Sequence, residues 1–106
     1  MERTISPASL KSMLNDVVVL DVRRESDYAA SQEILPGSVW RDPEGIDAWL
    51  GEVLTDRDVV IYCVRGGSVS NSVVDRLQAA GVRARYIEGG IEGWKAASGS
   101  VTVKRT

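Results

Sequence analysis

Two short runs of consecutive apolar residues are the clearest pattern in this chain, at residues 17–20 and 59–62. Uninterrupted branched runs of this length are typical of strands that are buried on both faces of a sheet. Residues 83–87 and the brief stretch 38–41 predict further strands, the latter directly after a Pro-Gly turn. The pattern therefore predicts a central sheet of four to five strands.

Apolar residues at helical spacing separate these strands. The strongest predicted helix covers residues 68–80, where Val69, Val73 and Leu77 share one face and Gly81 ends the helix. Weaker stripes and capping signals predict helices at residues 6–14, 25–30, 42–54 and around 91–94. Alternating strands and helices predict an α/β fold, a three-layer α/β/α arrangement around a mostly parallel sheet.

Length and charge narrow the class of protein. A chain of 106 residues forms one domain, which we place at residues 1–98, with a polar C-terminal tail at residues 99–106. The net charge of −2 shows no excess of positive charge, so neither nucleic acid nor an anionic membrane is expected as a partner. No apolar run approaches the ~18 residues of a membrane span. Residues 1–4 lack the apolar core of a signal peptide, which favours a cytoplasmic protein.

The chain contains one cysteine and no histidine, and this restricts its chemistry. A single cysteine excludes an internal disulfide and any metal site built from several cysteines. The absence of histidine excludes Ser-His-Asp catalysis, Cys-His catalysis and histidine-ligated metals. We expect no metal and no cofactor, and any reaction must proceed without an imidazole base.

The single cysteine, Cys63, ends the second apolar run and precedes the strongest helix. The residues between them are Val64, Arg65, Gly66, Gly67 and Ser68. Such a loop can direct successive backbone N–H groups and the positive end of a helix toward an anion, and nearby cations favour a thiolate. A lone cysteine is more often a small buried hydrophobe. Here its neighbours are residues that build no core, so the context favours a sulfur nucleophile.

Several polar or glycine residues follow the predicted strands directly, as Cys63 does. They are Asp21, Arg23, Arg41, Gly89 and Gly90. In an open parallel sheet the site lies beyond the carboxyl ends of the strands, so these residues are expected on one rim. We expect an ion pair or hydrogen bonds between the first two, and a turn bordering the pocket at the two glycines. Arg41 is either a solvated arginine or an anion contact.

Three segments together resemble the single-domain rhodaneses. Residues 20–23 (Leu-Asp-Val-Arg) resemble the family's Asp-x-Arg strand end, and residues 63–68 resemble its six-residue active-site loop. Residues 89–94 resemble its Gly-Gly-x-x-x-Trp signature. The resemblance covers residues 4–97 and departs at residues 31–38, where only the Pro-Gly turn of the family's usual stretch remains.

The resemblance implies a thiosulfate sulfurtransferase. Cys63 would take the outer sulfur of a small anionic donor such as thiosulfate, hold it as a persulfide and pass it to cyanide or a thiol. It implies substrate contacts from the loop residues Val64, Arg65, Gly66, Gly67 and Ser68, and we add Arg41 as a candidate second cation on the rim. From their positions at strand ends we assign supporting roles to Asp21, Arg23, Gly89 and Gly90.

Three alternatives use the same fold. Phosphatase or arsenate-reductase relatives place an arginine six positions after the cysteine, but Val69 stands there. An interaction module without catalysis would not need Cys63. A sulfur carrier that serves an acceptor protein would retain it, and the sequence does not separate this carrier from a free-standing enzyme.

Overall fold

The computed structural model describes residues 2–53 and 55–104. Its centre is a five-stranded sheet in the order β1-β6-β5-β2-β4, in which every neighbouring pair is parallel. The strands are β1 (Thr4–Ile5), β2 (Val18–Asp21), β4 (Val39–Trp40), β5 (Asp58–Tyr62) and β6 (Arg83–Ile87). The parallel sheet is confirmed, and β5 lies at its middle because its run of apolar residues tolerates burial on both faces.

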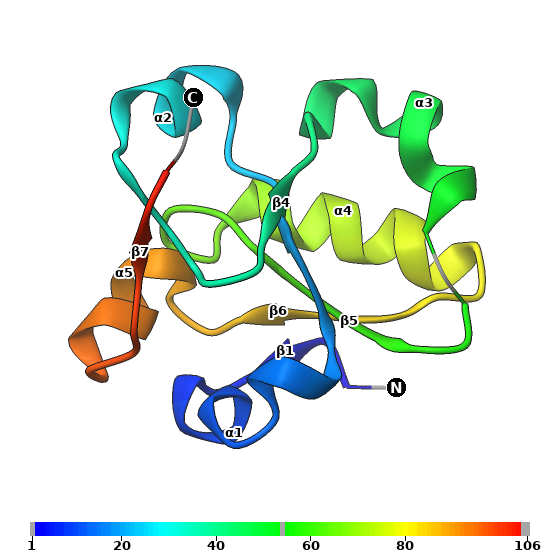
Figure 1. The fold of residues 1–106 in the computed structure, drawn as a ribbon. Coiled ribbons are helices and arrows are strands. Elements are labelled where there is room, and N and C mark those ends of the chain that lie inside the picture. The colour runs from blue at the N-terminus through cyan, green and yellow to red at the C-terminus, as the bar shows by residue number, and fades with distance from the viewer. Residues whose placement is uncertain (1, 54, 105–106) are drawn as a thin grey trace.

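Helices cover both faces of this sheet, which confirms the predicted three layers (Figure 1). Val59 and Ile61 of β5 pack with α3 (Ile46–Trp49) and α4 (Ser68–Ala79). Val60 and Tyr62, which point the opposite way, pack with α1 (Pro7–Lys11) and α5 (Gly90–Ala96). Successive side chains of a strand alternate between faces, so one apolar run supplies both cores.

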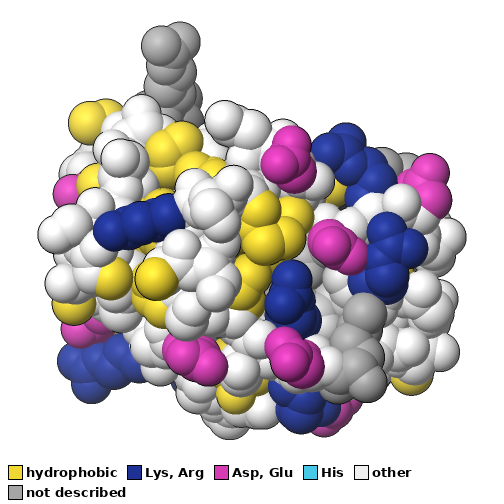
Figure 2. All heavy atoms as spheres, turned by 90° about the horizontal axis from the view of Figure 1, so that it is seen from below, with side chains coloured by type: hydrophobic (Ala, Val, Ile, Leu, Met, Phe, Trp, Pro, Cys, Tyr) yellow, Lys and Arg dark blue, Asp and Glu magenta, His cyan; other side chains and the backbone are white. Residues whose placement is uncertain are grey.

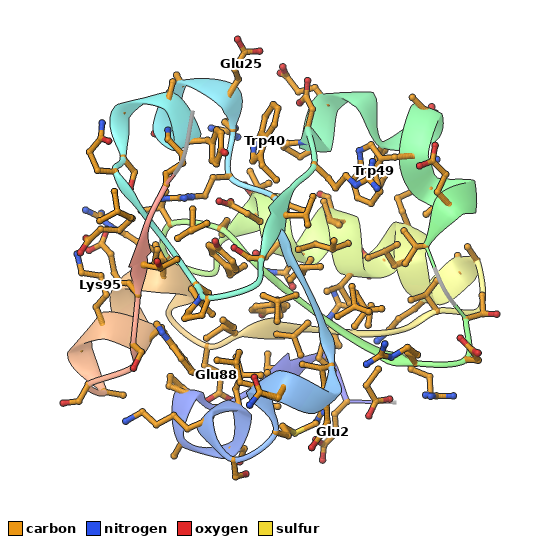
Figure 3. All side chains as sticks on the ribbon, viewed as in Figure 1. Glu2, Glu25, Trp40, Trp49, Glu88 and Lys95 are labelled. Atoms are coloured by element: carbon orange, nitrogen blue, oxygen red, sulfur yellow. The ribbon has the colours of Figure 1, made fainter. Side chains whose placement is uncertain are left out.

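The helix predicted over residues 42–54 is broken into short pieces. The α3 helix is one turn long and lies between 3₁₀ helices at Pro43–Gly45 and Leu50–Glu52, and Leu54 lies outside the described residues. Gly45 and Gly51 each lower helix stability by about 1 kcal/mol relative to alanine, which explains the breaks. The buried Trp49 still points from α3 into the core, as its apolar stripe predicts (Figure 3).

The first predicted helix is shorter than expected. It consists of α1 followed by a 3₁₀ helix at Leu14–Asp16. The side chain of Ser6 accepts a hydrogen bond from the backbone N–H of Ser9 at 3.1 Å, so the predicted helix start is confirmed.

The C-terminal segment lies against the fold. Within it, β7 (Thr102–Val103) pairs antiparallel with β3 (Glu33–Ile34), and residues 105–106 of the expected tail lie outside the described residues. The backbone N–H of Lys104 donates to Gln32 O at 2.7 Å. Its Nζ donates to Tyr28 O at 2.7 Å, at the end of α2 (Glu25–Ala30), and lies 4.2 Å from the Tyr28 ring centroid. The segment thereby holds residues 32–34, which belong to the stretch that departs from the family pattern.

The surface carries mixed charge. On the face shown in Figure 2, Lys and Arg side chains lie among Asp and Glu side chains rather than in one basic patch. Within residues 2–53 and 55–104, no helix combines the length and the apolar character that crossing a membrane requires.

Candidate active site

Cys63 follows β5 directly and is 7% exposed. The chain turns back after it through Gly66, whose φ of +74° lies in the region that glycine adopts readily. This turn brings the backbone N–H of Gly66 to 3.1 Å from Cys63 Sγ. A backbone donor at this position can stabilise negative charge that develops on the sulfur during a reaction.

The Cys63 loop rests on the first turn of α5, which begins at Gly90. The backbone N–H groups of Ile91 and Glu92 donate to the carbonyl oxygens of Cys63 and Val64, at 2.9 and 3.2 Å. A Cβ atom on Gly90 would lie 2.5 Å from both of these oxygens. Glycine at this position therefore permits the close approach that joins the loop to α5.

We expect Gly90→Ala to damage both stability and activity. The φ of Gly90 is +62°, which costs alanine about 1–2 kcal/mol, and the clash with the loop carbonyls adds about 1–3 kcal/mol. Gly81→Ala is the matched control, because Gly81 has a φ of +86° but nothing within 4 Å of its Cβ position. Equal losses of unfolding free energy in denaturant titrations of the two variants would contradict the close-approach argument.

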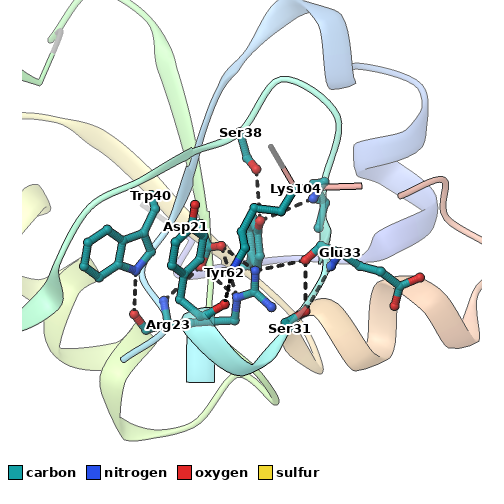
Figure 4. Close-up of polar contacts among 10 residues, drawn as sticks. Asp21, Arg23, Ser31, Glu33, Ser38, Trp40, Tyr62 and Lys104 are labelled. Carbon is teal, nitrogen blue, oxygen red and sulfur yellow. Dashed lines mark hydrogen bonds and ion pairs between the residues drawn. The ribbon is translucent and has the colours of Figure 1, made fainter. Parts of the chain in front are cut away.

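Asp21 and Arg23 form a buried ion pair, 0% and 2% exposed (Figure 4). Arg23 Nε donates to Asp21 Oδ1 at 3.0 Å, and Arg23 Nη2 donates to Asp21 Oδ2 at 2.7 Å. Burial alone lowers the pKa of the Arg23 guanidinium, but the hydrogen bonds and the charge of Asp21 outweigh it, so this pKa is raised. The expected pairing of these residues is confirmed.

The same buried network includes Tyr62, the last residue of β5. Its hydroxyl lies 3.0 Å from Ser38 Oγ and accepts a hydrogen bond from the backbone N–H of Leu35 at 3.3 Å. Burial, and then the charge of Asp21, raises the pKa of this hydroxyl. Arg23 Nη2 also donates to Glu33 O at 3.0 Å, so the network holds residues 33–38 against the carboxyl end of the sheet.

A cavity of about 380 Å³ lies beside Cys63. The loop lines it with Cys63, Val64, Arg65, Gly67 and Ser68, and other segments contribute Arg23, Arg24, Asp27 and Val69. The structure thus brings the predicted loop and the end of β2 together. Sequence reasoning missed Arg24, which could have been found because it directly follows the Asp-x-Arg strand end.

The two predicted anion-binding arginines lie in different places. Arg65 lines the cavity, and its Nε donates to Glu92 Oε2 at 3.1 Å. Arg41 follows β4, as expected, but its side chain pairs with Glu52 at 3.7 Å and does not line this cavity. The geometry therefore favours Arg65 over Arg41 as a substrate contact.

A second cavity, of about 510 Å³, adjoins the first. Both are lined by Arg23, Asp27 and Val64. The second is also lined by Glu33, Glu92 and Lys95, with Ala30, Ser31 and Ile91. The two cavities therefore meet at Arg23, Asp27 and Val64, and only the first is lined by Cys63.

Comparison with known proteins points to one family. The family model described as "Rhodanese-like domain" matches residues 6–97. A protein named "Sulfurtransferase" from Allochromatium vinosum is 30% identical over 97 residues, covering 89% of each chain. The structure of a rhodanese-related protein from Thermoplasma volcanium superposes with a TM-score of 0.86 over 96% of this chain and 99% of that one, at 22% identity.

A second kind of relative matches a shorter stretch. A tRNA 2-selenouridine synthase from Shewanella sp. (strain ANA-3) is 42% identical over 50 residues, which is 47% of this chain. The matched stretch spans only 14% of that relative's length.

Proposed function

Because this chain belongs to the rhodanese-like domain family, we propose that it is a sulfurtransferase that carries sulfane sulfur on Cys63. The observation that carries this proposal is the position of Cys63 Sγ. It lies at the end of β5, 3.1 Å from the Gly66 N–H, beside a cavity lined by arginine side chains. An anionic sulfur donor fits such a cavity, since both its sulfur and its leaving group carry negative charge.

The first step loads the sulfur. The thiolate of Cys63 attacks the outer sulfur of thiosulfate, the sulfur–sulfur bond of the donor breaks, and sulfite leaves with the bonding electrons. The backbone N–H of Gly66 stabilises negative charge on the resulting persulfide. Since sulfite leaves as an anion, no acid has to protonate it, and the chain needs no histidine for this step.

The second step transfers the sulfur from Cys63 to an acceptor. A thiolate acceptor or cyanide attacks the outer sulfur of the persulfide, and Cys63 leaves as a thiolate. The products are an acceptor persulfide or thiocyanate. The adjoining cavity provides an approach for this acceptor, because it shares Val64 with the cavity at Cys63.

Arg65 and Arg24 bind the anionic donor in this proposal. Both line the cavity at Cys63, whereas Arg23, which lines it too, is engaged in the buried pair with Asp21. Val69, also in the lining, stands where a phosphatase of this fold needs an arginine. The lining therefore favours sulfur transfer over phosphate chemistry.

Mass spectrometry after incubation with thiosulfate tests the proposal. We expect the intact protein to gain the mass of one sulfur atom and proteolytic fragments to locate this sulfur on Cys63. Subsequent addition of cyanide should remove it and release thiocyanate. An unchanged mass after thiosulfate treatment would contradict the proposal.

The relatives named tRNA 2-selenouridine synthase favour a second candidate, in which Cys63 carries selenium instead of sulfur. The chemistry is the same displacement, with selenosulfate as donor and sulfite as leaving group. The net charge of −2 does not favour RNA binding by this chain alone. The same mass measurement with selenosulfate separates the two candidates, since only the second requires a stable gain of selenium.

A further inference from the structure

We propose that Glu92 is a specificity-determining residue for the sulfur donor. In the protein without substrate, its carboxylate pairs with the guanidinium of Arg65. An anionic donor that binds Arg65 must displace this carboxylate. The residue thereby weakens the binding of doubly charged anions beside Cys63. This inference rests on the proposed function, because it assigns Arg65 to the donor.

Contacts fix Glu92 next to the Cys63 loop. Its Oε2 accepts a hydrogen bond from Arg65 Nε at 3.1 Å, and its backbone N–H donates to Val64 O at 3.2 Å. The carboxylate is therefore attached to the same turn of α5 on which the loop rests. The side chains of Arg65 and Glu92 are 80% and 54% exposed, so a small anion can reach the guanidinium and take its place.

Most of the other charged side chains around the two cavities are paired with residues that do not belong to the Cys63 loop. Arg23 is paired with the buried Asp21, and Lys95 is paired with Glu33. Glu92 lines the second cavity but pairs with Arg65, a cation that lines the first. Asp27 also lines the cavity at Cys63, but Glu92 is the carboxylate that holds Arg65, the cation assigned to the donor.

The expected size of this effect is modest and measurable. Exposed ion pairs change an equilibrium by about two- to five-fold, because solvent screens them. Glu92→Gln should therefore lower the KM for thiosulfate about three-fold, while kcat changes by less than about two-fold. The monoanion methanethiosulfonate should show a smaller decrease in KM, since the repulsion removed scales with the charge of the donor.

A matched variant controls for the loss of one surface carboxylate. Glu88 precedes the glycine pair, and its Oε2 accepts a hydrogen bond from Thr4 Oγ1 at 3.0 Å. It lines neither of the two cavities. Glu88→Gln removes the same charge elsewhere on the surface and should leave the KM for thiosulfate unchanged.

A second readout separates specificity from a purely structural role. If Glu92 only held Arg65 and the loop in place, Glu92→Gln would raise the KM instead of lowering it. The proposal also requires coupling between the two residues, so in an Arg65→Ala background the Glu92→Gln substitution should lower the KM by less. A KM that rises, or that falls equally with and without Arg65, would overturn the inference.

Anion binding without chemistry completes the test. The dissociation constant of sulfite is measured by calorimetry in Cys63→Ser and in Cys63→Ser with Glu92→Gln, and we expect it to be about three-fold smaller in the second protein. Equal or weaker sulfite binding in the second protein would overturn the role of Glu92. A wild-type protein that gains no sulfur from thiosulfate, with sulfite binding as expected, would instead refute only the proposed function.

Discussion

Cys63→Ser is expected to lower the rate of thiocyanate formation from thiosulfate and cyanide by more than about 10³-fold. Oxygen cannot replace sulfur here, because a serine hydroxyl is a weak nucleophile without an adjacent base and forms no stable link to sulfane sulfur. The chain holds no histidine that could activate it. The variant should also gain no mass from thiosulfate.

The loss must be separated from misfolding. Cys63 is 7% exposed and accepts a hydrogen bond from Gly66, and serine is close to cysteine in size and accepts hydrogen bonds as well. We therefore expect the thermal unfolding midpoint of Cys63→Ser to stay within a few degrees of the wild-type value. A shift of this size corresponds to a change of about 1 kcal/mol in the free energy of unfolding. Thiocyanate formation at the wild-type rate in this variant would rule out Cys63 as the sulfur carrier.

Asp21→Ala is expected to lower the free energy of unfolding by about 3–5 kcal/mol. The substitution leaves the guanidinium of Arg23, which is 2% exposed, without the carboxylate that neutralises it. A loss of this size is a large fraction of the stability of a small domain, about 5–15 kcal/mol in total. Denaturant titration monitored by tryptophan fluorescence measures it.

An exposed pair on the same sheet provides the control. Arg83 Nε donates to Asp58 Oδ1 at 2.8 Å, but the two side chains are about half exposed. Asp58→Ala should therefore cost less than about 1 kcal/mol. Asp21→Asn keeps the shape and one acceptor oxygen of the carboxylate. Its loss of unfolding free energy should therefore lie between those of Asp21→Ala and Asp58→Ala. Equal losses for Asp21→Ala and Asp58→Ala would show that burial of the first pair does not determine its contribution.

The elements that sequence reasoning missed are short. The strands β1, β3 and β7 have two residues each, too few to show a period of two. The pairing of β7 with β3 uses backbone groups, which almost every residue supplies whatever its side chain. The composition of residues 99–104 therefore did not indicate it. Uninterrupted apolar runs such as residues 59–62 carry a strong signal, because burying them contributes most to stability.

The sequence by itself determined the α/β class, the middle strand and the strongest helix. It also placed Cys63 in a glycine loop between that strand and that helix. These features are local, since neighbouring residues encode an apolar run, a positive φ or a helix end. Residue spacing was sufficient for them.

Only the tertiary structure decided which distant residues meet at the rim. It placed Gly90 under the Cys63 loop, paired Arg65 with Glu92, and directed Arg41 to Glu52 and away from the cavity. The physical reason is that each contact joins side chains or backbone groups on different elements. Their distance depends on strand order and on how the helices pack, and these are properties of the whole folded chain.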